Sequence, residues 1–70
     1  MDRYFVNCNV DNYHKTNRIL VENHIDIISM MDNHDGTSDF IIKCGENTAQ
    51  QLRDLGIFLV RDQILRFNML

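Results

Sequence analysis

The chain has 70 residues, of which 44% are hydrophobic, and a formal net charge of −3. A chain of this length forms one domain and buries only about 60% of the surface that its unfolded form exposes, so a partner would add stability. Seven Lys and Arg against ten Asp and Glu leave no basic surface for a phosphate backbone. We therefore expect no nucleic-acid partner.

The N-terminus and the cysteines bear on location and chemistry. The first residues lack the pattern of a signal peptide, and no apolar run approaches the roughly 18 residues that span a bilayer. We therefore expect a cytoplasmic protein with reduced thiols and no membrane partner. Cys8 and Cys44 lack the CxxC spacing of zinc and redox motifs, so we expect neither a metal nor a cofactor.

The first predicted elements are a strand and a helix. Apolar residues alternate along the N-terminal stretch and predict a strand with one buried face, made by Tyr4, Val6, Cys8 and Val10. Residues 11–24 predict a helix with Asp11 or Asn12 as N-cap. Its inward stripe, spaced by three and four residues, is thin and comprises Tyr13, Thr16, Ile19, Leu20 and Asn23.

A hairpin is predicted next. Residues 25–32 and 38–44 are short runs rich in Ile and Met, and Asp35-Gly36 lies between them. Glycine accepts the positive φ that a tight hairpin turn requires. In the first run, Ile25 and Ile27 would face one side of the sheet, and Ile28 and Met30 the other.

The last elements are a second helix and a strand. We expect Asn47 or Thr48 as the helix N-cap, with Gln50 completing a capping box, and Gly56 as the left-handed residue that ends the helix. Ala49, Leu52 and Leu55 would face inward. Residues 57–60 predict the fourth strand, and residues 61–70 either continue it or turn at 61–63 into a fifth short strand at 64–67.

The order βαββαβ predicts an α+β fold, the ferredoxin-like sandwich. Its four-stranded antiparallel sheet has the order 4-1-3-2 and two helices on one face. Cys8 and Cys44 would then lie near opposite ends of the sheet, too far apart for a disulfide within one chain. Apolar residues are expected on both faces of the second and fourth strands, which favours a homodimer that covers the open face or extends the sheet.

Residues 19–44 resemble the ACT domain, a small regulatory module attached to many enzymes of amino-acid metabolism. The resemblance covers nearly the whole chain and rests on Ile19, Leu20, Glu22, Ile25, Asp26, Ile27 and the pair Gly56-Ile57. It implies a single ACT-like domain over residues 1–70, regulatory and homodimeric, that binds an amino acid. Asp26 occupies the position of the family's Asn, which reaches toward the ligand across the subunit interface.

The sequence departs from the family pattern at two glycines. The turn after the first strand has no glycine, and His24 stands where the family has one before the Ile-Asn-Ile run. Candidate ligand-binding residues are Asn9, Asp11, Asn12 and Asp26. Each has a second interpretation, because the first three suit a cap or turn and Asp26 suits a charge that protects a sheet edge.

No catalytic motif is recognisable, and we expect no enzyme activity. His14 and His24 would lie about 15 Å apart at the two ends of the first helix, so they share no metal within one subunit. His34, at the hairpin tip, is either solvated or clustered across an oligomer. The sequence predicts a regulatory domain that binds a small metabolite or an enzyme partner. The alternative is a protein-binding module, such as a phage or bacterial inhibitor, with no small ligand.

Overall fold

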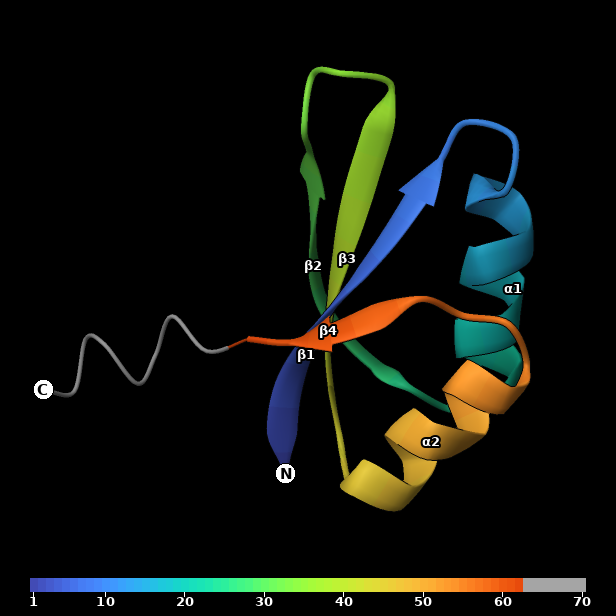
Figure 1. Cartoon of the computed structure of the whole chain (residues 1–70), viewed down its shortest axis with the longest axis vertical. Coiled ribbons are helices and arrows are strands. Elements are labelled where there is room, and N and C mark those ends of the chain that lie inside the picture. The colour runs from blue at the N-terminus through green and yellow to red at the C-terminus, as the bar shows by residue number, and fades with distance from the viewer. Residues whose placement is uncertain (63–70) are drawn as a thin grey trace, which may run out of the picture.

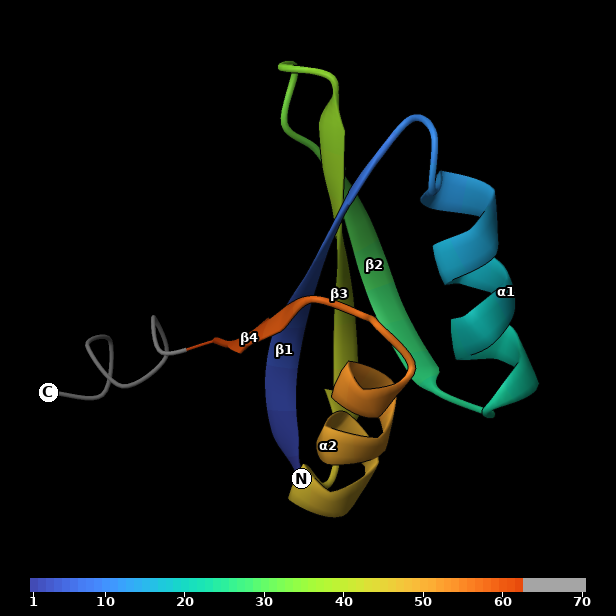
Figure 2. The ribbon, with the colours of Figure 1, turned by 45° about the vertical axis from the view of Figure 1, so that its right-hand side comes forward.

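The computed structural model describes residues 1–62 as an antiparallel sheet with two helices on one of its faces (Figures 1 and 2). The elements in chain order are β1 (Asp2–Asn9), α1 (Tyr13–Glu22), β2 (Asp26–Asp32), β3 (Thr37–Cys44), α2 (Glu46–Asp54) and β4 (Leu59–Arg61). The predicted βαββαβ order is confirmed over these residues. The arrangement is consistent with a ferredoxin-like fold.

The four strands lie in the order β2-β3-β1-β4, which is 4-1-3-2 read from the opposite edge. All three neighbouring pairs are antiparallel. Cys44 lies opposite Asp2 and Cys8 lies opposite Ser38, so the two cysteines are separated by about 20 Å along the strands. Both are free and buried, as the topology predicted.

The core lies between the sheet and the helices. Alternation along β1 buries Tyr4, Val6 and Cys8, and their counterparts on β3 are Phe40, Ile42 and Cys44. The prediction for Val10 was wrong, because β1 ends at Asn9 and Val10 lies in the following turn with 80% of its surface exposed. The buried face of β1 therefore ends at Cys8 and lacks the fourth apolar residue that the sequence pattern predicted.

A β-bulge in β2 changes the predicted faces of that strand. The pairing with β3 shifts between Ile27 and Ser29, which lie opposite Ile42 and Ile41. The extra residue, Ile28, breaks the alternation, so Met30 lies opposite the buried Phe40 and shares its face. Met30 was predicted on the side of the sheet opposite to that of Ile27, and this was wrong because the bulge places both residues on the same face.

Helix α1 ends in a Schellman motif. The N–H of His24 donates to the carbonyl of Val21 at 3.1 Å, and the N–H of Ile25 donates to that of Leu20 at 3.0 Å. This geometry requires a left-handed residue, and His24 has φ of 56°. Histidine therefore occupies a backbone conformation that glycine adopts without strain.

Helix α2 begins earlier than predicted. Its N-cap is Gly45, and Asn47 and Thr48 lie inside the first turn, so neither residue is the cap. β3 ends at Cys44 and the helix begins at Glu46, so Gly45 is the one residue between them and takes the cap position. Ala49 and Leu52 are buried as predicted.

The end of α2 confirms one prediction and corrects another. Gly56 has φ of 90° and its N–H donates to the carbonyl of Arg53, so the predicted stop is confirmed. Leu55 occupies the C-cap and is 54% exposed, so it does not face inward.

The last described strand is short. Ile57 is buried, but its N–H donates to the carbonyl of Leu52, so the strand begins only at Leu59. Arg61 belongs to β4 and forms ion pairs with Asp2 at 3.2 Å and Glu46 at 3.9 Å. The predicted alternatives for residues 63–70 lie outside the described residues. Neither helix within residues 1–62 is long and apolar enough to cross a membrane.

Candidate functional site

A hollow, the hairpin hollow, lies between the β1–α1 loop and the tip of the β2–β3 hairpin, which are neighbours at the top of Figure 1. Its volume is about 350 Å³. Polar lining comes from Asn9, Asp32, His34, Thr37 and Ser38, and apolar lining from Val10 and Tyr13. The hollow forms because Asn9 at the end of β1 lies opposite Thr37 at the start of β3.

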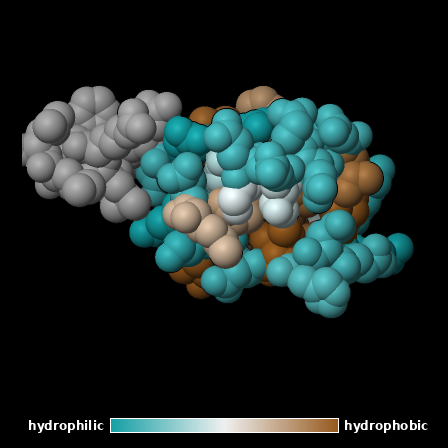
Figure 3. Space-filling model, turned by 90° about the horizontal axis from the view of Figure 1, so that it is seen from below, coloured by the Kyte–Doolittle hydropathy of each residue, from teal (hydrophilic) through white to brown (hydrophobic). Residues whose placement is uncertain are grey.

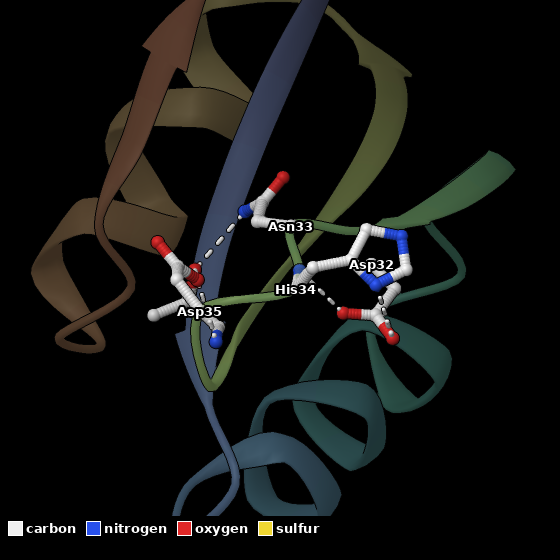
Figure 4. Close-up of polar contacts among 5 residues, drawn as sticks. Asp32, Asn33, His34 and Asp35 are labelled. Carbon is white, nitrogen blue, oxygen red and sulfur yellow. Dashed lines mark hydrogen bonds and ion pairs between the residues drawn. The ribbon is translucent and has the colours of Figure 1, made fainter.

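Asp32 and His34 hold one side of the hairpin tip. The backbone N–H of His34 donates to Oδ1 of Asp32 at 2.8 Å, and its Nδ1 lies 4.0 Å from Oδ2 (Figure 4). This contact holds His34 in a left-handed conformation with φ of 59°. The His34 side chain is 87% exposed and the Asp32 side chain 66%, so both can contact a ligand that arrives from solvent.

Asp35 and Thr37 hold the other side of the tip. Oδ1 of Asp35 accepts hydrogen bonds from both the backbone N–H and the hydroxyl of Thr37. These bonds stabilise the carboxylate and lower the pKa of Asp35, with the Thr37 hydroxyl as the largest cause. Asn33 donates to the Thr37 hydroxyl oxygen at 3.1 Å and to Asp39 at 3.3 Å. The tip is therefore fixed by side chains on both sides.

The β1–α1 loop is held by a reciprocal pair of asparagines. Oδ1 of Asn9 accepts hydrogen bonds from the backbone N–H groups of Asp11 and Asn12 at 3.0 and 3.1 Å. Oδ1 of Asn12 accepts the N–H of Asn9 at 2.8 Å. Asn12 is the N-cap residue of α1, as predicted, but its side chain holds the loop and makes no hydrogen bond to the helix. The turn interpretation therefore accounts for both asparagine oxygens.

Tyr13 forms the floor between these two segments. Its ring lies 5.3 Å from that of Phe40, centroid to centroid, and its hydroxyl donates to the sulfur of Met30 at 3.1 Å. The contact with Met30 depends on the bulge that turns this residue toward the helices. The turn after β1 has no glycine, unlike the family pattern, and in this chain the Tyr13 ring lines the hollow where the family has exposed backbone.

Asp26 lies at the other end of the sheet. It begins β2, is exposed, and lies opposite Lys43, beside a second hollow of about 200 Å³ that His24, Cys44 and Thr48 also line. Seen from the end where α2 lies, the surface is mostly polar, with apolar patches between the polar side chains (Figure 3). Within one chain, Asn9, Asp11 and Asn12 lie together, and Asp26 is not brought to them.

The cysteines and histidines do not form a reactive cluster in residues 1–62. Burial raises the pKa of both thiols, Cys8 and Cys44, so neither is an activated nucleophile. His14 lies in the first turn of α1 and His24 just beyond its last turn, as predicted. Among the described residues, no three His, Cys, Asp or Glu side chains are grouped so as to hold a metal ion.

No protein-family model, curated protein or solved structure gives a significant match to this chain. The ACT resemblance therefore stays a hypothesis that rests on the residues quoted for it.

Of the residues that line the hollow, the sequence predicted Asn9 as a ligand contact but not the polar residues of the hairpin tip. Asp32, Thr37 and Ser38 flank the Asp-Gly turn, and His34 precedes it. The signal was available, because in a βαββαβ fold the end of the first strand lies beside the start of the third. The polar residues around the turn could therefore have been placed next to Asn9.

Proposed function

We propose that this protein is a non-catalytic, ACT-like regulatory domain that works as a homodimer and binds a small metabolite, such as an amino acid, in the hairpin hollow. The observation that supports the proposal is the hollow itself. Two loops that are distant in sequence meet there and contribute a carboxylate, an imidazole, hydroxyls and an aromatic ring. Its volume lies at the lower end of the range for small-molecule sites, about 300–1,000 Å³.

The lining has the chemistry that a zwitterion requires. The exposed Asp32 carboxylate can accept hydrogen bonds from an ammonium group. The Ser38 hydroxyl and the His34 imidazole can donate to a carboxylate. Val10 and Tyr13 offer apolar surface for a side chain. The high exposure of Asp32 and His34 predicts weak binding, because charge pairs in water contribute little.

Regulation by such a site follows from linkage. A ligand that bridges the β1–α1 loop and the hairpin tip favours the arrangement in which these segments are close. It can shift the activity of an attached or bound enzyme only by the difference in its affinity for the two arrangements.

A thermal-shift screen with the twenty amino acids tests the proposal, because a ligand that binds only the folded state raises the melting temperature. The responding ligand is then tested on Asp32→Asn and on Asp26→Asn. We expect the first substitution to abolish the shift and the second to leave it unchanged. Loss of the shift in Asp26→Asn alone would move the site to the other end of the sheet, and no shift with any amino acid would refute binding of an amino acid.

A protein-binding module without a small ligand is the second candidate. It is favoured by the sheet face opposite the helices, where Phe5 lies opposite Ile41 on one side and Val60 on the other. Contiguous apolar surface of this kind marks interaction sites. A chain that is monomeric and responds to no amino acid would favour this second function.

A further inference from the structure

The pair Asp35-Gly36, at the tip of the β2–β3 hairpin, has the features that a rearrangement of the main chain requires. Both residues are exposed. Gly36 has φ of 88°, and no atom beyond its chain neighbours lies within 4 Å of the place that a Cβ would occupy. Within residues 1–62 the N–H of Gly36 makes no hydrogen bond. Its nitrogen is therefore unhindered and free to approach the carboxyl group of Asp35.

The reaction that this contact permits is a cyclisation. The nitrogen of Gly36 attacks Cγ of Asp35, the new C–N bond closes a five-membered succinimide, and the amide proton leaves with the carboxyl hydroxyl as water. Water then adds to one of the two ring carbonyls and breaks its bond to the nitrogen. Opening at Cγ restores aspartate, and opening at the main-chain carbonyl gives isoaspartate, whose chain runs through Cβ and Cγ. Water is the only other reactant.

Two other exposed aspartates beside loops lack this combination. Asp11 is followed by Asn12, whose N–H is hydrogen-bonded within the β1–α1 loop. Asp32 is followed by Asn33, whose N–H donates across the hairpin at 3.1 Å. In both pairs the attacking nitrogen is already engaged and carries a side chain beside it. The structure therefore favours reaction at Asp35.

Thr37 opposes the reaction in the folded chain. Oδ1 of Asp35 accepts hydrogen bonds from the backbone N–H and the hydroxyl of Thr37, which hold the carboxyl group away from free rotation (Figure 4). The same bonds lower the pKa of Asp35, with the hydroxyl as the largest cause. A carboxylate cannot release its oxygen as water, so the cyclisation needs the protonated acid, and these bonds make that form scarcer.

We propose that Asp35-Gly36 isomerises spontaneously to isoaspartate through a succinimide, and that the Thr37 hydroxyl slows this reaction in the folded protein. The inference goes beyond the proposed function and does not depend on it. Isoaspartate adds one carbon to the main chain between His34 and Thr37, which both line the hairpin hollow. Because loop length sets the register of a hairpin, the product has an altered wall on this side of the hollow.

Peptide mapping after incubation of the whole folded chain at 37 °C and mildly acidic pH tests the proposal. Trypsin releases residues 19–43 as one peptide, which contains Asp26, Asp32, Asp35 and Asp39, so three other aspartates serve as internal references. The succinimide is lighter by one water, and the isoaspartyl form has unchanged mass but separates by chromatography. Electron-transfer fragmentation assigns the modified residue. We expect isoaspartate to accumulate at Asp35 and not at the other three.

Two substitutions of Thr37 test the role of its hydroxyl. Thr37→Val removes the hydroxyl and keeps the backbone N–H, and we expect isoaspartate to form about two- to fivefold faster, as the loss of one exposed hydrogen bond to a carboxylate implies. Thr37→Ser keeps a hydroxyl and should react at the wild-type rate. Asp32→Ala removes the bond to the N–H of His34 on the other side of the tip and is the matched control for loosening. It should not react faster.

The same comparison in urea separates structure from sequence. The hydrogen bonds of Thr37 exist only in the folded chain, so wild type and Thr37→Val should react equally fast when unfolded, and faster than folded wild type. Circular dichroism confirms that each variant is folded in the first experiment. Isoaspartate that is absent from Asp35, or more abundant at another aspartate, overturns the proposal. So does a rate for Thr37→Val that equals wild type in the folded chain, that is matched by Asp32→Ala, or that stays higher than wild type in urea.

Discussion

Replacing His24 with glycine should stabilise the protein. His24 is the left-handed residue after α1, with φ of 56°, and its imidazole is exposed. At this helix end the N–H of His24 donates to the carbonyl of Val21, the N–H of Ile25 donates to that of Leu20, and the Asn23 side chain donates to that of Ile19, so none of these bonds uses the His24 imidazole. Glycine keeps all of them and removes the Cβ that makes this conformation unfavourable.

The magnitude follows from two opposing terms. A non-glycine residue in the left-handed region costs about 1–2 kcal/mol. Glycine gives back about 0.5–1 kcal/mol through the larger freedom of the unfolded chain. The net gain in the free energy of unfolding for His24→Gly is therefore about 0.5–1 kcal/mol, which raises the melting temperature by about 3–6 °C in a domain of this size.

Thermal and urea unfolding at pH 8 measure this gain, with His24→Ala as the control. Alanine removes the imidazole but keeps the Cβ, so the strain should persist and the melting temperature should not rise. An equal rise in both variants would show that the imidazole, and not the backbone conformation, is unfavourable. A fall in the melting temperature of His24→Gly would refute the reasoning.

Three further predictions follow from burial, backbone conformation and charge. Gly56→Ala should lower the free energy of unfolding by about 0.5–1 kcal/mol, since φ is 90° and an added Cβ meets no atom within 4 Å, so the cost is conformational and the smaller freedom of the unfolded chain offsets part of it. Leu20→Ala should cost about 2–5 kcal/mol in urea unfolding because Leu20 is fully buried, whereas the adjacent Val21→Ala, 58% exposed, should change stability little. The pKa of Asp35 is lower in the folded protein than in the unfolded chain. Its ionised carboxylate therefore stabilises the fold fully at pH values above the pKa of Asp35 in the unfolded chain, and this contribution is lost as the pH falls through the pKa in the folded protein. The stability difference between wild type and Asp35→Asn, measured by thermal unfolding against pH, should therefore shrink toward zero at acid pH, and a constant difference would contradict this.

Local chemistry made much of the fold predictable. The alternation of Tyr4, Val6 and Cys8 predicted a strand with one buried face, and glycines predicted the hairpin and the end of α2. These signals depend on residues close in sequence. His24 is instructive because the family resemblance marked it as a missing glycine, and the structure gives it the left-handed conformation that a glycine would favour.

The errors have a common physical origin in contacts between distant segments. The bulge that moves Met30 to the helix side is set by the pairing of β2 with β3, and the early start of α2 by where β3 ends. The candidate site divides in the same way, because Asn9 and Asp26 looked equivalent in sequence but lie at opposite ends of the sheet.

The sequence by itself determined the order of the elements, the inward residues of β1 and the turns, because these follow from periodicity and backbone preference within a few residues. Tertiary structure alone decided which loops meet to form the hollow, which face of β2 each methionine occupies, and that Asn9 and Asp26 lie at opposite ends of the sheet. Each of these depends on strand register, and a shift of one residue in register exchanges the two faces of a strand.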